Sequence, residues 1–392
     1  MKKSLTALAV LGVFAGSAMA ADVTLYGALD TGFEYFHHKT TNFDGTSVKD
    51  DTFDMQTGWD TGNRWGLKGS EDLGNGYKVS FKLESGFNGD TGTMGQGSRL
   101  FGREAGLTLS GPFGSVAFGR FGGIASSCGT YDMLGYVESF DGGDGDVWGF
   151  AASDRYDNMV VYQTPRFAGL QATVQYSFKT DTNENATDDF SGAEGTSDAQ
   201  RYASIGLSGE YGPAQFAVGY ELTKYGSNGN GTERKLSKDD GHMVFVGGNY
   251  DFEVVQLFAE AQYFKGQTAA AGVDVMDKDG DFYDLLNADP AYRSGFEGLK
   301  GYGLHVGAVV PFGDNALTVG AYYVDGKAVA KDYDDIDFSF AGVSARYNYS
   351  LSERTALYVG AGYGQTKVDG EEGGSDYKAQ VSQVYCGLTH TF

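Results

Sequence analysis

The chain has 392 residues and a formal net charge of −23 at pH 7, from 52 acidic and 29 basic side chains. This balance excludes broad nucleic-acid binding, because such binding needs basic surface to neutralise phosphates. A mean hydropathy of −0.32, with no long apolar run after the first residues, excludes a protein that crosses a membrane with helices. The 61 glycines against 5 prolines, with 14% aromatic residues, favour strands and tight turns.

The first twenty residues have the pattern of a secretory signal peptide. Lys2 and Lys3 precede an apolar stretch over residues 5–15, and Ala18-Met19-Ala20 offers a cleavage site. We therefore expect residues 1–20 to be removed. Residues 21–392 show no linker or break in composition, which predicts one domain.

From Asp22 onward, stretches of about ten residues alternate between apolar and polar side chains, the period of a strand with one wet face. In "VQLFAEAQY" (255–263), for example, Leu257 and Tyr263 fall on one face, and Glu260 and Gln262 on the other.

Two kinds of connection alternate between these stretches. The short ones lie at 110–115, 164–170, 210–215, 250–254, 311–316 and 350–355. The long ones are acidic and rich in glycine, at 37–62, 121–154, 179–200, 225–241, 265–300, 326–337 and 365–380. Counting strands between them predicts an all-β fold, a sixteen-stranded antiparallel transmembrane β-barrel with short turns on one side and long extracellular loops on the other. A soluble β-sandwich would use shorter strands and more uniform loops.

A barrel of about sixteen strands encloses an aqueous channel, whereas eight would be filled by side chains. The sequence thus predicts passage of small hydrophilic solutes. Every backbone group must be paired inside the bilayer, so the last strand should pair with the first. Phe392 then lies on the outward face, with Cys386. Cys386 and Cys128 could form a disulfide in an exported protein, although two unpaired thiols are the favoured interpretation.

The acidic segment at 136–149, "YVESFDGGDGDVWG", can be interpreted in two ways. It is either one more solvated loop, or it folds into the bore and presents Glu138, Asp141 and Asp144 to the opposite wall. The residues alone leave both open.

The scarce basic residues belong in the lumen or at its rim, because a cationic side chain facing lipid is costly. Strand parity points Arg64 and Lys82 inward, and Arg155 begins a strand. Arg120 has outward parity, and only a bulge or twist at the strand end would turn it inward.

Several segments resemble the Gram-negative general diffusion porins over essentially the whole of residues 21–392. They are "DVTLYGALDTGFEY", "NRWGLKGSEDLGNGYKVSFKLESGF", "LFGREAGLTLSGPFGSVAFGRF", "RYDNMVVYQTPRFAGL" and "GLTHTF". The resemblance implies a homotrimer in the cell outer membrane, each barrel with its own pore and with the third loop folded inward to form a constriction.

The resemblance also implies residue roles. Arg64, Arg120 and Arg155 match basic wall residues, joined by Lys82 from its parity. Glu138, Asp141 and Asp144 match the facing acidic loop, and the terminal Phe392 matches the signal read by the barrel-insertion machinery. Two departures are Ala28, where some relatives have lysine, and "ESFDGGDGD" in place of a "PEFGG" turn. Together they indicate a less basic constriction and leave its exact acidic residues open.

The expected function is passive diffusion of ions and small hydrophilic solutes, with a substrate-selective porin for sugars or a specific anion as the alternative. An enzyme is not expected, because the chain has no Gly-x-Ser-x-Gly and no histidine spaced with Ser or Asp for catalysis. We expect no cofactor and no metal site, since "DKDGDFYD" (277–284) lacks the glycine and glutamate positions of an EF-hand. The expected partners are other copies of the chain, outer-membrane lipid and the transported solutes.

Overall fold

The structure is a computed structural model, and it describes residues 22–126, 129–133, 148–182, 192–226, 239–274, 292, 295–370 and 375–392. The predicted signal peptide, residues 1–20, lies outside this range and stays a prediction. No helix among the described residues is both long and apolar enough to cross a membrane.

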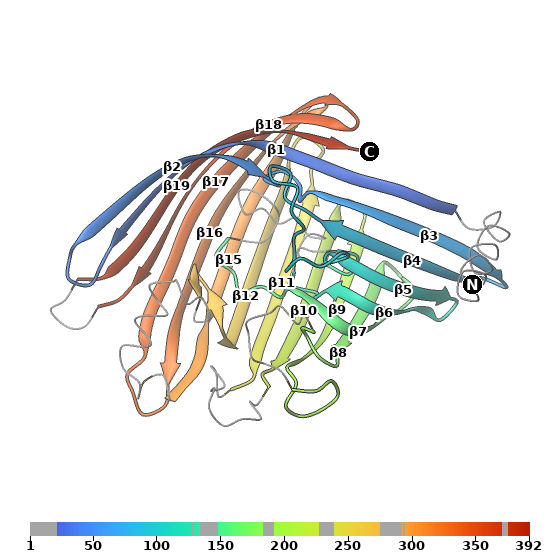
Figure 1. Cartoon of the computed structure of the whole chain (residues 1–392), viewed down its shortest axis with the longest axis horizontal. Coiled ribbons are helices and arrows are strands. Elements are labelled where there is room, and N and C mark those ends of the chain that lie inside the picture. The colour runs from blue at the N-terminus through green and yellow to red at the C-terminus, as the bar shows by residue number, and fades with distance from the viewer. Residues whose placement is uncertain are drawn as a thin grey trace, which may run out of the picture.

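The described residues form strands that Figure 1 colours from blue to red along the chain. Their bounds are β1 Asp22–Thr41, β2 Ser47–Thr57, β3 Arg64–Gly74, β4 Tyr77–Gly86, β5 Glu104–Gly111, β6 Gly114–Gly122, β7 Arg155–Gln163, β8 Leu170–Ser177, β9 Arg201–Tyr211, β10 Ala214–Lys224, β11 Gly241–Asp251, β12 Gln256–Gln267, β13 Ala269–Ala270, β14 Val273–Asp274, β15 Phe296–Phe312, β16 Asn315–Ala330, β17 Ile336–Ser352, β18 Thr355–Val368 and β19 Tyr377–Thr391.

Sixteen of these strands close into an antiparallel barrel. The sheet runs β3 to β12 and then β15 to β19, and β1 pairs with both β19 and β3, so that the first and last strands close the wall. Red β19 accordingly lies beside blue β1 in Figure 1. At the closure, the backbone N–H and C=O of Phe392 each bond to Gly27 at 3.0 Å. The predicted all-β sixteen-stranded barrel and the pairing of its ends are confirmed.

The alternation in the sequence separates the two faces of the wall. Leu257 and Tyr263 of β12 are each 47% exposed on the outer face, whereas Glu260 and Gln262 are each 3% exposed inside. This arrangement suits a wall between hydrocarbon and water. The exposed apolar side chains favour lipid, and the buried polar side chains need hydrogen-bonding partners inside.

Two predicted loops are largely strand, so these predictions were wrong. Within 37–62, β1 continues to Thr41 and β2 occupies Ser47–Thr57. β2 pairs with residues 31–41 of β1. Within 326–337, β16 runs to Ala330 and β17 begins at Ile336. The error arose because polar composition was equated with loop. A ladder that rises above the membrane keeps its backbone bonds while both faces meet water, so its side chains need not alternate.

The buried core lies inside the barrel. Its larger cluster joins inward side chains of β11, β12 and β15 to β18 to residues of the β6–β7 connection, among them Ile124 and Phe150. A smaller cluster centres on Phe121, Met159 and Tyr202. The bore is therefore partly filled by wall side chains and by residues of the β6–β7 connection.

Candidate functional site

Both ends of the connection between β6 and β7 lie against the inner wall. We call residues 123–126 and 148–154 the loop ends. Ala125 of the first donates its backbone N–H to Glu221 Oε1 of β10 at 2.9 Å. Ser153 Oγ of the second donates to the same oxygen at 2.9 Å. One buried carboxylate thus joins both loop ends to the wall.

Neighbouring side chains complete this anchor. Tyr202 of β9 also donates its hydroxyl to Glu221 Oε1 and accepts the N–H of Ile124 at 3.1 Å. Farther along the wall, Gln262 of β12 accepts the N–H of Ala151 at 2.9 Å and donates to its carbonyl at 2.6 Å. The inner wall therefore satisfies backbone groups of both loop ends, as buried polar groups require.

Aromatic rings fix the second loop end across the bore. Trp148 meets the rings of Tyr322 and Phe340, with centroids 5.8 and 5.3 Å away. Phe150 packs over Gly303 of β15, where an added Cβ would come within 2.6 Å of the ring. Only glycine lets the loop lie this close to the strand. The predicted inward fold of this connection is confirmed for its described ends.

The acidic residues expected at the constriction, Glu138, Asp141 and Asp144, lie outside the described residues. The same holds for Cys128. Cys386 is a free thiol on the outer face.

Lys82 of β4 belongs to an inward-facing cluster of charges. Its Nζ lies 2.7 Å from Glu104 and 3.7 Å from Glu84. Arg103 Nε donates to Glu84 at 2.8 Å, and Tyr26 donates to the other oxygen of Glu84 at 2.8 Å. The sequence interpretation missed both carboxylates and Arg103, although Lys82 and Glu84 share the inward parity.

Arg64 opens β3 on the inward face, in register with Ala28 and Gly86, and donates through Nη1 to the carbonyl of Gly62 at 3.3 Å. Along the β3–β4 ladder, Arg64 lies two residue pairs from Glu84 and four from Lys82, on the same face of the wall.

Arg120 and Arg155 meet at the upper end of β6 and β7. Arg120 stands opposite Ala105, and the ladder between β6 and β7 shifts its register beside it, between Gly119 and Phe121. Its Nη1 donates to Asp157 at 2.6 Å and to the Arg155 carbonyl at 3.2 Å, and its Nε donates to the Gly102 carbonyl at 2.8 Å. The structure thus joins Arg120 to Arg155. The Gly102 carbonyl that Arg120 binds directly precedes Arg103 and Glu104 of the Lys82 cluster.

Arg99, in the connection between β4 and β5, was also missed. It bonds to Asp157 at 2.8 Å and to Asp181 at 2.6 Å. Burial alone would lower the pKa of Arg99, but the two carboxylates outweigh burial and raise it. This contact ties two long connections together above the barrel wall.

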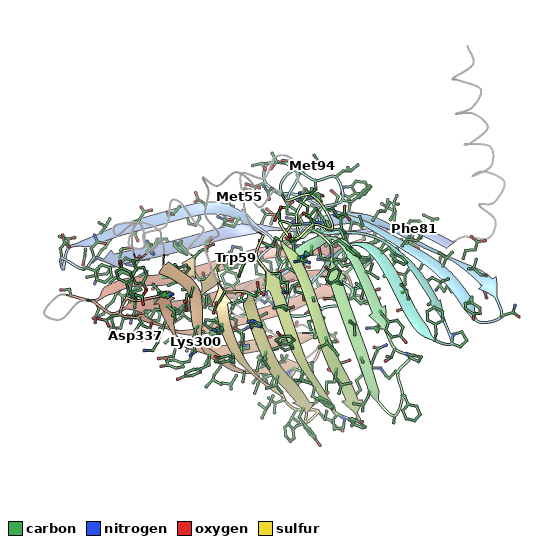
Figure 2. The ribbon with its side chains drawn as sticks, turned by 90° about the horizontal axis from the view of Figure 1, so that it is seen from below. Met55, Trp59, Phe81, Met94, Lys300 and Asp337 are labelled. Atoms are coloured by element: carbon green, nitrogen blue, oxygen red, sulfur yellow. The ribbon has the colours of Figure 1, made fainter. Side chains whose placement is uncertain are left out.

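A second segment also enters the bore. We call residues 58–63, between β2 and β3, the inner-wall segment. Trp59 stacks on Tyr385 of β19 with ring centroids 4.6 Å apart and an interplanar angle of 11°, and Figure 2 labels Trp59 near the middle of the barrel. Arg346 of β17 donates to the Trp59 carbonyl at 2.9 Å. The segment therefore spans from β1 to β17 on the inner wall.

Two carboxylates hold the inner-wall segment. Asp60 accepts from Asn348 at 2.6 Å and from Thr389 at 2.9 Å, and lies 3.6 Å from Arg346 Nε. Asp30 of β1 accepts from Tyr358 at 2.6 Å, and also from the N–H groups of the segment itself, at 2.6 Å from Asp60 and 2.8 Å from the next residue. No sequence signal marks this arrangement, because the partners lie nearly three hundred residues away.

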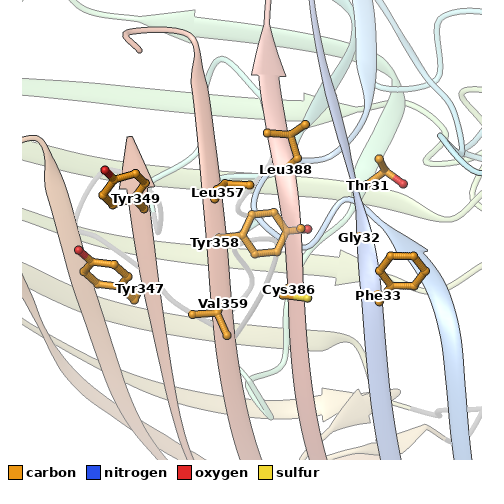
Figure 3. A pocket seen from close by; sticks show the side chains of 11 residues that line it. Thr31, Gly32, Phe33, Tyr347, Tyr349, Leu357, Tyr358, Val359, Cys386 and Leu388 are labelled. Atoms are coloured by element: carbon orange, nitrogen blue, oxygen red, sulfur yellow. The ribbon is translucent and has the colours of Figure 1, made fainter. Parts of the chain in front are cut away.

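The outer face carries a shallow apolar hollow of about 450 Å³ where β17, β18, β19 and β1 meet. Figure 3 shows Phe33, Leu357, Val359, Cys386 and Leu388 around it. Phe392 is 46% exposed on this outer side, its ring over Gly27. Among the described residues, no three His, Cys, Asp or Glu side chains group as metal ligands.

The barrel has sixteen strands, an apolar outer band and a connection that folds inward. Comparison with known proteins agrees with this architecture. The sequence profile of the Gram-negative porin family matches residues 6–369. The chain belongs to the Gram-negative porins. It is 36% identical to an outer membrane porin protein of Bordetella pertussis over the whole of both chains.

Another relative and a solved structure are also porins. Outer membrane porin protein 32 of Delftia acidovorans is 29% identical over 99% of this chain and 95% of that protein. The solved anion-selective porin from Comamonas acidovorans has the same fold, with a TM-score of 0.64 and 24% identity over 95% of this chain and all of that one. This porin is therefore an outer-membrane protein, and its relatives are channel proteins.

Proposed function

We propose that this porin allows passive diffusion of ions and small hydrophilic solutes through a bore narrowed between an acidic third loop and a basic wall. The observation that carries the proposal is the attachment of both loop ends inside a closed sixteen-stranded barrel. A barrel of this size is otherwise an open aqueous channel, so the connection between the loop ends determines its narrowest part.

The proposed constriction has two sides. Glu138, Asp141 and Asp144 form the acidic side, between the anchored loop ends. Arg64 and Lys82 form one part of the basic side, and Arg120 and Arg155 form the other. Opposite charges across a narrow, partly desolvated gap orient dipolar solutes and give cations and anions separate paths.

The four basic residues differ in their surroundings. Lys82 is neutralised by Glu104, and Arg120 by Asp157. Arg64 stands between the Lys82 cluster and the inner-wall segment, whose Gly62 carbonyl accepts its Nη1. We assign Arg64 an effect on anions, because it lies beside a segment that itself narrows the bore.

We also propose a homotrimer as the functional assembly. A solved outer membrane protein of Vibrio cholerae, OmpT, is described in a trimer form and shares this fold at a TM-score of 0.55. The outer face of β19 and β1, with its apolar hollow, is suited to contact another apolar surface.

Single-channel conductance of the refolded protein in planar bilayers, with the reversal potential under a KCl gradient, tests the proposal. We expect steps in groups of three, a shift toward cation preference in Arg64→Ala, and a shift toward anion preference in Glu138→Gln. The matched control is Arg354→Ala in the turn between β17 and β18, outside the bore. No conductance would mean that the bore is closed, and a current blocked by one sugar or anion alone would favour the substrate-selective alternative. Either result would overturn the general-diffusion proposal.

A further inference from the structure

Three lysines form one row across the outer face of the barrel. Lys265 of β12 stands directly opposite Lys300 of β15, and Lys300 directly opposite Lys327 of β16. All three are exposed, while their neighbours Phe264 and Leu299 are fully buried inside. The strands lie about 4.8 Å apart, so the row places three cations within roughly 10 Å.

Such a row costs stability unless an anion compensates it, because like charges directly opposite on neighbouring strands repel. The two outer members have carboxylate partners: Lys265 lies 2.9 Å from Asp239, and Lys327 lies 3.0 Å from Asp337. Lys300, between them, makes no ion pair with any of the described residues. Figure 2 labels Lys300 and Asp337 near one another.

The row lies where the barrel leaves the bilayer. Two residues below it, about 7 Å away, the next row holds Tyr263 of β12, Tyr302 of β15 and Asp325 of β16, in direct register. Tyr263 and Tyr302 are 47% and 45% exposed. The following outward residues on β15 are Leu304 and Val306, 47% and 54% exposed. Aromatic rings above an apolar band mark the membrane interface.

The side of the membrane follows from the connections. β12 and β15 are joined by residues 268–295, one of the long connections, and long connections of such barrels are extracellular. The lysine row therefore stands at headgroup height in the outer leaflet, facing lipid and not the bore. Basic clusters at this depth recognise anionic headgroups.

We propose that Lys265, Lys300 and Lys327 bind the phosphate group of an outer-leaflet lipid, whose acyl chains lie along the apolar rows beneath. Lys300 supplies the uncompensated charge. Lys265 and Lys327 can turn from their exposed carboxylate partners to the phosphate at little cost, because exposed ion pairs contribute little. Tyr263 and Tyr302 supply hydroxyl donors just below. This site is independent of the conduction path.

Acidic groups surround the row, and the test has to distinguish their contribution to lipid binding from that of the lysines. Besides Asp239 and Asp337, Asp335 lies 3.8 Å from Lys327, and Asp325 and Glu297 lie on the neighbouring parts of β16 and β15. A divalent cation held by these carboxylates could bridge to a lipid phosphate without the lysines. Measurement in EDTA removes that route.

The experiment is native mass spectrometry of the whole folded protein in detergent with EDTA and diphosphoryl lipid A as the probe. We expect retained lipid A to fall about fivefold in Lys300→Gln and further in the triple variant with Lys265→Gln and Lys327→Gln. Lys300→Arg should retain it. Lys224→Gln is the matched control, an exposed lysine near Asp240 at the end of β10. Unchanged heat-modified migration on gels and unchanged conductance show that the variants fold.

Three outcomes would overturn the inference. Equal retention by the wild type and the triple variant means that the lysines do not bind the lipid. Equal loss in Lys224→Gln means a general effect of charge. Loss of lipid A from the wild type in EDTA means that carboxylates and a divalent cation form the site. A final arm adds excess inorganic phosphate: undisturbed retention supports a lipid headgroup, and full displacement indicates a site for free phosphate.

Discussion

The loop ends and the inner-wall segment both narrow the bore, yet they are held by different chemistry. The loop ends meet buried groups: Glu221, at 3% exposed, and Gln262, at 3%, each bind backbone atoms. The inner-wall segment is held on one side by buried Asp30 and on the other by Asp60 and Arg346, whose side chains each remain 15% exposed. The loop ends thus rest on a buried network alone, whereas the inner-wall segment adds a charge pair at the edge of water.

This difference predicts different responses. A buried carboxylate that accepts several hydrogen bonds is costly to lose, because its donors are left unsatisfied. A charge pair near water contributes little to stability but strongly affects the local field. The loop ends should therefore control pore size, and the inner-wall segment should control ion preference.

The largest effect is expected from Glu221→Ala. Ala125, Ser153 and Tyr202 all donate to one oxygen of Glu221, so its removal should cost about 3 kcal/mol and release both loop ends. Conductance should rise and become noisy, and the urea midpoint of unfolding should fall. Glu221→Gln keeps the accepting oxygen and is the control. Equal behaviour of the two variants would contradict the anchoring role.

Gly303→Val should give an intermediate effect. A side chain at this position would enter the space of Phe150, since a Cβ alone reaches within 2.6 Å of its ring. Overpacking of this kind typically costs about 1–3 kcal/mol. We expect altered conductance, detected in single-channel recordings, with the barrel still folded. Gly95→Val, in the connection between β4 and β5, is the control, because an added Cβ there meets its nearest atoms at 3.5 Å. An unchanged conductance in Gly303→Val would show that Phe150 does not position the loop.

Asp60→Asn should change selectivity more than stability. The amide keeps the size of the side chain, but the charge that balances Arg346 is lost. We expect a stability loss of about 1 kcal/mol or less and a reversal potential shifted toward anions. The double variant Asp60→Asn with Arg346→Gln should restore the original preference. If the single variant matches the wild type in a salt gradient, the segment does not contribute to the field of the bore.

The smallest effect is the dependence of ion selectivity on salt concentration. Screening shortens the Debye length from about 10 Å at 0.1 M to about 3 Å at 1 M. The selectivity difference between wild type and Asp60→Asn should therefore shrink as KCl rises, whereas the conductance difference of Glu221→Ala should persist. A loop effect that also vanishes at 1 M KCl would mean that both segments are held by charge.

Much of the fold was predictable from sequence. The alternation that placed Leu257 outward and Glu260 inward is local, because each side chain responds to lipid or water on its own face. Alternating loop lengths predicted the number of strands and the side of the long connections. Parity also placed Arg64 and Lys82 on the inward face of neighbouring strands, as observed.

Only the tertiary structure decided which of these residues meet. Arg120 meets Asp157 across the shifted β6–β7 ladder, and Asp60 of the inner-wall segment meets Arg346 of β17, a strand distant in sequence. Lys265, Lys300 and Lys327 form one row for the same reason. Side-chain direction follows from a period of two within one strand, but alignment between strands depends on the stagger with which the whole barrel closes. That stagger is a property of all sixteen strands together, and no single stretch of sequence contains it.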